Sequence, residues 1–268
     1  MVLGEGTLVG LRDEDGGVTL IRLIDDSRRI KGLGVMNTFQ RLSTMQFGDN
    51  IQLGRKSYAL TRPRLPEIAS GMRRGAQTIS AKDAGLFITR MGIGAGDRVL
   101  EAGIGSGGLS IHILRALGDR GELISVENRS AHAETALSNI SDAIESMGVG
   151  ASHDCLIGDI SEVADGLKPS FDAVILDLPD HPSAVAACAP LLTIGGRIGC
   201  YCPVSTQLEK SWEACEEAGL EVEWAGELME REWGRASRGG MRPVNGPFGH
   251  TAFLLIAVKA ASGNDSDR

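Results

Sequence analysis

From residue 97 onward, short apolar runs alternate with segments whose apolar residues recur at helical spacing. The first run, residues 98–102, predicts a buried strand, and Leu109, Ile113, Leu114 and Leu117 then recur at helical spacing. Later apolar runs predict strands at residues 123–126, 153–159, 171–177, 197–202, 220–229 and 250–258. Because strands and helices alternate, the sequence predicts an α/β fold with a doubly wound, mainly parallel sheet.

Residues 1–65 have a different pattern, in which short apolar segments are separated by turn sequences rich in aspartate and glycine. These segments predict the strands of a small all-β, barrel-like domain, at residues 7–9, 18–24, 33–35, 51–53 and 57–60. Pro63 and Pro66 disfavour strand pairing and mark its end. We expect an N-terminal domain at 1–65, an α/β domain at 66–260 and a disordered tail at 261–268. Small β-barrels bind nucleic acid or serve as dimerisation modules, and the sequence leaves both roles open.

A glycine-rich turn follows the first strand of the α/β domain. Gly103, Gly105, Gly107 and Gly108 stand between that strand and the next helix. Glycine permits a sharp backbone turn and lets a ligand approach main-chain N–H groups. The spacing Gly103-x-Gly105-x-x-Gly108 matches the dinucleotide-binding pattern, but such turns also bind S-adenosylmethionine (SAM) or serve only helix–strand packing.

The residue that separates these ligands is Glu101, two positions before the first glycine. A carboxylate there repels the pyrophosphate of NAD, whereas it suits the ammonium and sulfonium groups of SAM. We therefore favour SAM over NAD. Glu127 comes after the next apolar run, where a carboxylate can hold the ribose hydroxyls of either cofactor.

Four carboxylates come at the ends of four successive predicted strands: Glu101, Glu127, Asp159 and Asp177. In open α/β sheets, ligands bind beyond the carboxyl ends of the strands. A single aspartate there usually caps the following helix, but four around a glycine turn predict a site for a positively charged ligand. We assign Glu101 to the methionine end, Glu127 to the ribose, Asp159 to the adenine amine, and Asp177 to the transferred methyl group.

The charge of the chain is unevenly distributed. The net charge is −8, but residues 1–65 contain 10 basic and 7 acidic residues (+3), and the remainder contains 17 and 28 (−11). Any contact with nucleic acid is therefore expected to be local and sensitive to salt. The candidate RNA-binding residues are Arg73, Arg74, Arg231, Arg235, Arg238 and Arg242, which are otherwise solvated surface charges.

Other features exclude some classes of protein. No run approaches the roughly 18 apolar residues of a membrane span, and the N-terminus lacks the pattern of a secretory signal. The five cysteines fall within predicted elements, which indicates reduced thiols and a cytoplasmic protein. Cys200 and Cys202 have no second pair to complete a zinc site, so we expect no metal.

Together, these motifs resemble the tRNA (adenine-N1)-methyltransferases that modify the T-loop, most closely their archaeal branch. The resemblance extends over nearly the whole chain. Its motifs are Met72-Arg-Arg-Gly-Ala-Gln77, Lys82-Asp83, Glu101-Ala-Gly-Ile-Gly-Ser-Gly107, Glu127-Asn-Arg129, Asp177-Leu-Pro-Asp180, Tyr201-Cys-Pro203 with Gln207, Glu230-Arg-Glu-Trp233, Arg242-Pro243 and His250-Thr-Ala-Phe253. Two positions depart from the family pattern: Ser80 replaces a common tyrosine, and His181-Pro182 replaces a common Pro-Trp pair.

The resemblance implies a class I, Rossmann-like methyltransferase sheet with an antiparallel last strand, and usually a homotetramer. It implies SAM-dependent methylation of N1 of adenine 58 in the tRNA T-loop, with adenine 57 as a further target in some archaeal members. It implies that the cofactor is bound by Gln77, Glu101, Gly103, Gly105, Ser106, Gly107, Glu127 and Asp159. It also places Asp177 at the reaction centre.

Three other functions stay open at this point. A methyltransferase acting on a small molecule or a protein carboxylate has the glycine turn but does not need the N-terminal domain or the arginine-rich loop. An NAD-dependent dehydrogenase is disfavoured by Glu101. A non-catalytic tRNA-binding subunit of the same family is disfavoured by the presence of Glu101, Glu127 and Asp177 together.

Overall fold

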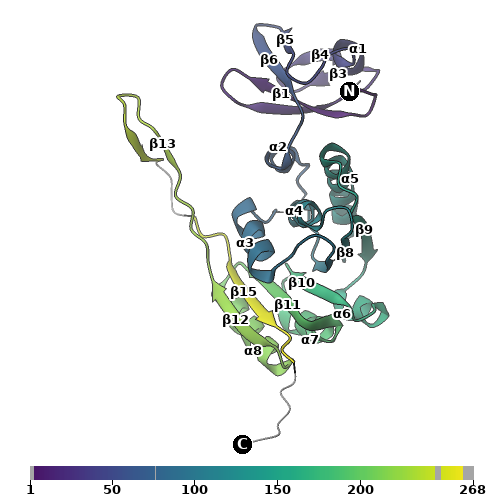
Figure 1. The fold of residues 1–268 in the computed structure, drawn as a ribbon, viewed down its shortest axis with the longest axis vertical. Helices are drawn as coiled ribbons and strands as arrows, with labels where there is room; N and C mark the ends of the chain where they lie inside the picture. Colours follow the sequence, from purple (N-terminus) through teal and green to yellow (C-terminus); the bar gives the residue numbers. More distant parts are fainter. Residues whose placement is uncertain (1–2, 76, 245–248, 262–268) are drawn as a thin grey trace, which may run out of the picture.

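The computed structural model describes residues 3–75, 77–244 and 249–261. An α/β body forms most of the molecule, the N-terminal β-module lies at one end of it, and a two-stranded hairpin projects from it (Figure 1). Nearly all of the predicted tail, residues 262–268, lies outside the described residues. No helix in the described ranges is long and apolar enough to cross a membrane.

The body contains a 7-stranded sheet with the order β12-β15-β11-β10-β7-β8-β9. Its strands are β7 (Arg98–Ala102), β8 (Glu122–Glu127), β9 (Ser152–Ile157), β10 (Phe171–Leu176), β11 (Leu192–Cys202), β12 (Glu221–Gly226) and β15 (Phe253–Val258). The pairs from β11 to β9 are parallel, whereas β15 is antiparallel to both of its neighbours. The predicted Rossmann-like α/β sheet with an antiparallel final strand is confirmed.

The strand order reverses direction between β7 and β10. From β7 the chain continues through β8 to β9 on one side, and β10 and β11 then lie on the other side of β7. Ligands of open α/β sheets bind beyond the carboxyl ends of the strands at such a reversal. Glu101 is on β7 and Glu127 ends β8, while Asp159 and Asp177 follow β9 and β10, so the four predicted carboxylates belong to adjacent strands.

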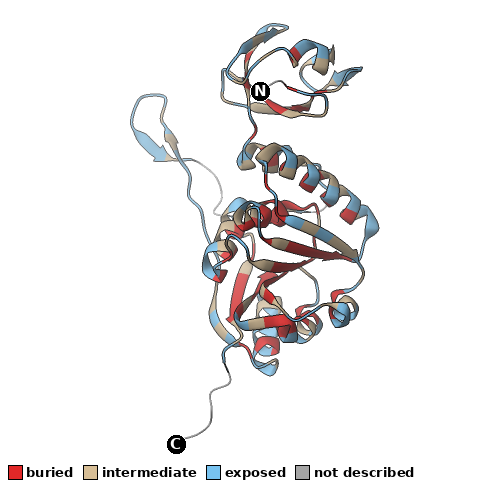
Figure 2. Cartoon of the chain, turned by 45° about the vertical axis from the view of Figure 1, so that its right-hand side comes forward, coloured by how far each residue is buried: buried red, intermediate tan, exposed pale blue. Residues whose placement is uncertain are grey.

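Helices cover both faces of the sheet. On one face, α3 (Ala81–Met91), α4 (Gly108–Leu117) and α5 (Ser130–Met147) share a buried apolar core with the strands. On the other face, α6 (Ile160–Val163), α7 (His181–Cys188) and α8 (Ser205–Glu217) do the same, with short 3-10 segments at Ala164–Gly166 and Ala189–Leu191. Figure 2 shows that the buried residues follow the strands and the facing sides of the helices.

Two helices begin at sequences with the spacing of a capping box. Ser80 and Asp83 predict the start of α3, and this is confirmed, because Ser80 Oγ accepts a hydrogen bond from Asp83 N at 3.4 Å. Thr206 and Glu209 predict the start of α8 in the same way, and this prediction is wrong. That helix begins at Ser205, and Gln207 Oε1 accepts a hydrogen bond from Val204 N at 3.4 Å.

The N-terminal module is an open sheet with a separate hairpin beside it. The antiparallel sheet contains β2 (Val18–Arg22), β1 (Leu8–Asp13), β6 (Lys56–Thr61) and β5 (Asn50–Leu53), in that order. The hairpin consists of β3 (Ser27–Ile30) and β4 (Gly34–Asn37), and α1 (Thr38–Leu42) follows it. Among the described residues no ladder joins β2 to β5, so the module differs from the predicted barrel. The sequence pattern predicts no strand at β3, because Ser27, Arg28 and Arg29 are all exposed and show no apolar alternation.

Specific contacts hold the module against the body. Arg22 of β2 forms ion pairs with Asp142 and Glu145 of α5. Leu20 packs on Gly71 at the end of α2 (Leu65–Gly71), where an added Cβ would lie 2.6 Å from Leu20 Cδ1. The module therefore rests on both α2 and α5.

The projecting hairpin is formed by β13 (Trp233–Arg235) and β14 (Met241–Pro243), which pair antiparallel. The sequence predicts an irregular arginine-rich loop here. Gly239 and Gly240 turn the chain between the strands, with φ angles of 88° and 84°. Trp233 and Met241 are 58% and 61% exposed, so the hairpin packs little of its apolar surface within one chain.

Candidate active site

The glycine turn after β7 brings the end of β10 close to the end of β7. Gly103 has a φ of 91°, and a Cβ on it would lie 2.1 Å from the main-chain oxygen of Asp177. Asp177 N in turn donates a hydrogen bond to Ala102 O at 2.9 Å. Gly103 therefore leaves room for the backbone that carries Asp177, as well as leaving the main chain of the turn uncovered.

Glu127 at the end of β8 is bonded to the glycine turn. Its side chain is 3% exposed, and its carboxylate accepts hydrogen bonds from Gly105 N at 3.2 Å and from Arg129 N at 3.0 Å. Arg129 Nε lies 3.4 Å from the same carboxylate. These donors fix the orientation of the Glu127 carboxylate at the carboxyl end of β8. A carboxylate that binds a ribose needs such a fixed orientation.

Glu101 lies beneath the turn rather than on the surface of the site. It is the second-to-last residue of β7, is 1% exposed, and accepts hydrogen bonds from Ser110 Oγ at 2.6 Å and Ser125 Oγ at 2.9 Å. Burial raises the pKa of Glu101 to about 7, the two serine hydroxyls oppose the shift, and the nearby charges of Asp177 and Glu127 add to it. A contact between Glu101 and the cofactor stays a prediction.

Asp177 directly follows β10 and is the second acidic group with an altered pKa. Burial raises its pKa to about 7, and the charge of Glu127 contributes further. Glu101, Glu127 and Asp177 thus form a cluster of carboxyl groups that repel one another when ionised. A cationic ligand among them stabilises their ionised forms.

A cavity of about 590 Å³ lies beyond the ends of β7, β8, β9 and β10. Four of the predicted site residues line it: Gly103, Glu127, Asp159 and Asp177. Its volume falls in the usual range for small-molecule sites. Asp159 is exposed and also caps α6, since its Oδ1 accepts a hydrogen bond from Ser161 N at 2.9 Å. Hydrogen bonding with Ser161 lowers the pKa of Asp159.

The other predicted cofactor residues do not line this cavity. They are Gln77, Glu101, Gly105, Ser106 and Gly107. Ser106 is buried, and its Oγ accepts a hydrogen bond from Gly75 N at 3.1 Å, which attaches the segment before α3 to the turn. Gly107 has a φ of 80°, and a Cβ on it would contact Ala136 O of α5 at 3.3 Å. Gln77 is exposed, two residues beyond the attached Gly75.

Asn139 is a positioning residue that sequence patterns did not single out. Its side chain donates to Arg73 O at 2.8 Å and Ser106 O at 2.9 Å, and accepts from Arg73 N at 3.1 Å. It is 4% exposed and lies within the buried stripe of α5. The sequence signal that could have identified Asn139 is a polar residue at a position of α5 where the helical spacing predicts an apolar one. The cavity residue Ser183 was also not singled out, and Asn128, Leu178 and Pro179 lie within the quoted motifs but were given no role.

A second polar cluster lies near Asp177. Lys82 Nζ donates to Asp83 Oδ1 at 2.6 Å and to Thr251 Oγ1 at 2.7 Å, which joins the start of α3 to the segment before β15. Burial raises the pKa of Tyr201 to about 12, and the charges of Asp83 and Asp177 add to this shift. His181, which belongs to one of the two departures from the family pattern, is buried at the start of α7.

The candidate RNA-binding arginines form two groups on the surface. Arg73 and Arg74 are exposed on the segment before α3, and Arg73 Nη1 donates to Ser138 Oγ at 2.5 Å. The second group lies on or beside the projecting hairpin, and all of its members are exposed: Arg231, Arg235, Arg238 and Arg242. Their contact with RNA stays a prediction.

Comparison with known proteins connects this site to one family. The sequence pattern of the family described as "tRNA methyltransferase complex GCD14 subunit" matches residues 62–239. The chain belongs to this family. The chain is 30% identical to the tRNA (adenine(57)-N(1)/adenine(58)-N(1))-methyltransferase TrmI of Methanocaldococcus jannaschii, over 75% of this chain and 78% of that one. It is 32% identical to the tRNA (adenine(58)-N(1))-methyltransferase TrmI of Thermus thermophilus, over 72% of this chain and 74% of that one.

The fold is similar to a solved structure along nearly its whole length. The crystal structure of a SAM-dependent O-methyltransferase from Thermotoga maritima superposes with a TM-score of 0.83 at 26% identity, covering 98% of this chain and 97% of that one. The GCD14 family member described here is therefore a SAM-dependent methyltransferase. Its acidic cavity fits this cofactor, because Glu127, Asp159 and Asp177 line it and a sulfonium or ammonium group would lower the raised pKa of Asp177.

The raised pKa values of Glu101 and Asp177 predict that SAM affinity depends on pH. A cation bound beside Glu101 and Asp177 favours their ionised forms, so binding lowers both pKa values and releases protons. We expect the affinity to rise as pH increases from about 5.5 to about 7, by at most about tenfold per pH unit for each proton released, and then to level off. Calorimetry in buffers of different ionisation enthalpy measures both effects. S-adenosylhomocysteine, whose sulfur is neutral, should show a weaker dependence, and a flat SAM profile would contradict the argument.

Proposed function

We propose that this chain transfers the methyl group of SAM to N1 of adenine 58 in the T-loop of tRNA, and also to adenine 57 where that position is adenine. The observation that carries the proposal is the acidic cavity at the β7/β10 reversal in a chain of the GCD14 family. The archaeal TrmI at 30% identity is named for both positions and the bacterial one for position 58.

The proposed chemistry requires alignment and charge stabilisation by this chain's own residues. SAM supplies an electrophilic methyl group on a positively charged sulfur. Glu127 holds the ribose and so fixes the depth of the cofactor in the cavity. Asp177 accepts a hydrogen bond from the exocyclic amine of the adenine, where positive charge develops as N1 forms its new bond. Because its pKa is raised, Asp177 is also suited to accept a proton from that amine afterwards.

The substrate has to present an unpaired adenine. N1 lies on the Watson–Crick edge of the base, so tRNA binding must leave that edge free or flip the nucleotide out. We place the adenine between Asp177 and the polar cluster of Lys82, Asp83, Tyr201 and Thr251, because the charge of Asp177 acts on Tyr201 of this cluster. The arginines of the hairpin, Arg235 among them, then contact the RNA backbone.

We also propose a homotetramer in the cytoplasm. The hairpin exposes Trp233 and Met241, and a two-stranded hairpin without other packing is only marginally stable. Exposed apolar surface of this kind is typical of protein interfaces. Light scattering on the purified chain measures the assembly directly. The proposed tRNA substrate supports a cytoplasmic location.

Methylation of an unmodified tRNA transcript tests the proposed function. With methyl-labelled SAM, we expect 1-methyladenosine as the labelled nucleoside and, after mapping, label at position 58. The matched control is the same transcript with adenine 58 replaced by guanine, which retains only the label due to position 57. Label on another nucleoside, or methyl transfer only to small molecules or protein carboxylates, would overturn the proposal.

A further inference from the structure

A groove separates the N-terminal module from the α/β body. It has a volume of about 440 Å³ and lies between the module on one side and α2, the segment after it, and α5 on the other. It is distinct from the acidic cavity, with which it shares no lining residue. Its apolar lining includes Ile24, Ile30 and Met72. Because the contacts of Arg22 and Leu20 hold the module in place, the groove is framed by packed elements.

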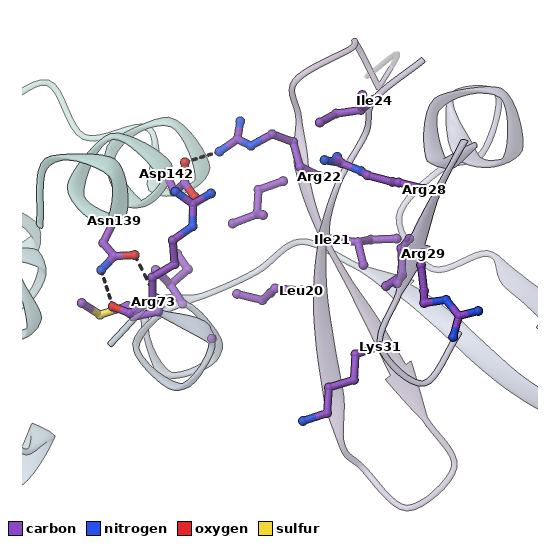
Figure 3. Close-up of a pocket in the computed structure, with 15 residues that line it drawn as sticks. Leu20, Ile21, Arg22, Ile24, Arg28, Arg29, Lys31, Arg73, Asn139 and Asp142 are labelled. Atoms are coloured by element: carbon purple, nitrogen blue, oxygen red, sulfur yellow. Dashed lines mark hydrogen bonds and ion pairs between the residues drawn. The ribbon is translucent and has the colours of Figure 1, made fainter. Parts of the chain in front are cut away.

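The charged side chains of the groove are almost all basic. The charged lining residues are Arg22, Arg28, Arg29, Lys31 and Arg73, with Asp142 as the one carboxylate among them. Figure 3 shows Arg22 facing Asp142, with Arg28 and Lys31 extending from the module and Asn139 holding Arg73 on the other side. Arg22 forms an ion pair with Asp142, so no carboxylate of the groove lining is left to neutralise the other basic residues.

Three of these cations are free to bind a ligand. Arg28, Arg29 and Lys31 are exposed at and after β3, and within the described part of the chain their side chains form no hydrogen bond or ion pair. Close cations repel one another and weaken folding unless an anion neutralises them. In a chain whose net charge is −8, this local excess of positive charge indicates an anionic ligand.

The arrangement favours an extended polyanion over a single small anion. A site for one phosphate gathers its donors around one point, whereas these cations are spread along a hairpin and across the groove from Arg73. Apolar residues such as Ile24 and Ile30 line the same groove, where sugars or bases of a nucleic acid can pack. A chain of phosphates with apolar surface between the charges matches this pattern.

The groove is also connected to the methyl-transfer site through the main chain. Arg73 lines the groove, and two residues later Gly75 N is bonded to Ser106 Oγ in the glycine turn. Asn139 joins both ends of this connection, since it bonds to Arg73 and to Ser106 O. A ligand in the groove therefore contacts the segment that leads to the cofactor turn.

We infer that this groove binds the sugar-phosphate backbone of the substrate tRNA at nucleotides away from the methylated adenine. The inference rests on the proposed function, which supplies the polyanion. Arg28, Arg29 and Lys31 contact phosphates, and Arg73 contacts the same strand from the body. The groove contributes to affinity and placement of the tRNA, not to the methyl-transfer step.

Neutralising the three free cations tests the inference. In the full-length chain, the triple variant Arg28→Gln/Arg29→Gln/Lys31→Gln should raise the Kd and KM for tRNA by about tenfold or more, with kcat and SAM affinity unchanged. The slope of log Kd against log salt should fall by about 2 to 3, since each lost phosphate contact removes about 0.7–0.9. Thermal melting and SAM binding verify that the exposed substitutions leave the fold intact.

A matched control is available in the same module. Arg12, Arg55 and Lys56 are exposed and lie outside the groove, and the last two are at the β5–β6 edge of the sheet, opposite β2. The triple variant Arg12→Gln/Arg55→Gln/Lys56→Gln changes the net charge equally and should change the tRNA affinity little. Equal losses in both variants, or no loss in the groove variant, would overturn the inference. Competition by poly-glutamate as strong as that by tRNA would assign the groove to an acidic polypeptide and also overturn it.

The same measurements separate this inference from the proposed function. If the unmodified chain binds tRNA and methylates adenine 58 but the groove variant behaves identically, only the groove assignment fails. If the unmodified chain neither binds nor methylates tRNA, the proposed function fails and the groove assignment fails with it.

Discussion

Replacement of Asp177 with alanine is expected to abolish methyl transfer while SAM still binds. The carboxylate directly follows β10, lines the acidic cavity, and is the group that we place beside the adenine amine. Loss of an acceptor where charge develops should lower the single-turnover rate by about 10²–10⁴. Because the pKa of Asp177 is about 7, its carboxyl is partly protonated at neutral pH without ligand, so its removal should raise the Kd for SAM by about tenfold at most, much less than it lowers the rate.

The Asp177→Asn variant separates charge from hydrogen bonding. It retains an acceptor oxygen and the size of the side chain, so we expect a rate between those of the alanine variant and the unmodified chain. The single-turnover rate of the unmodified chain should also fall at pH values below the pKa that Asp177 has with SAM bound, which the cofactor lowers from the ligand-free value of about 7, and this fall should be absent in the asparagine variant. A single-turnover rate within about tenfold of normal in Asp177→Ala would exclude the catalytic assignment.

The second large effect is expected at Glu127, and it concerns cofactor affinity. The Glu127→Ala variant removes the carboxylate that accepts from Gly105 N and Arg129 N and that we assign to the ribose. Hydrogen bonds to a charged group contribute about 1.5–3 kcal/mol each, so the loss of two ribose contacts should raise the Kd for SAM by about 10²-fold or more. S-adenosylhomocysteine has the same ribose and should lose affinity equally, as measured by calorimetry.

Glu122 provides a control on the same strand. It begins β8, at the opposite end from Glu127, and its Oε2 accepts a hydrogen bond from Arg98 Nε at 2.5 Å. The Glu122→Ala variant should therefore lower the melting temperature without changing the Kd for SAM. A folded Glu127→Ala protein that binds SAM with nearly normal affinity would contradict the ribose assignment.

The elements that bury an apolar face were the ones that the sequence predicted. The strands β7 and β10 consist of apolar runs because helices cover both faces of the sheet, so periodicity locates them within one or two residues. By contrast, β3, β13 and β14 are paired strands with little or no core contact, and each is largely exposed. Apolar alternation reports burial rather than pairing, so hairpins at the edge of the molecule leave no such signal.

The sequence predicted those site residues that are acidic and that also stand at the end of a predicted strand. Carboxylates at the ends of adjacent strands identified Glu127, Asp159 and Asp177, which all line the cavity. The depth of a side chain is set by packing between distant segments, and sequence spacing does not report it. Glu101 therefore proved to lie beneath the turn, held by Ser110 and Ser125. For the same reason the groove between module and body, which depends on how β2 docks on α5, had no counterpart in the sequence pattern.

The absence of a side chain at Gly103 has a mechanical consequence. With no methyl group between them, the loop proposed to hold the methyl donor and the loop that carries Asp177 are in direct backbone contact. Displacement of either loop then shifts the other, so the methyl donor and the carboxylate of Asp177 keep a constant separation. Main-chain packing, rather than adjustment of flexible side chains, therefore sets this distance.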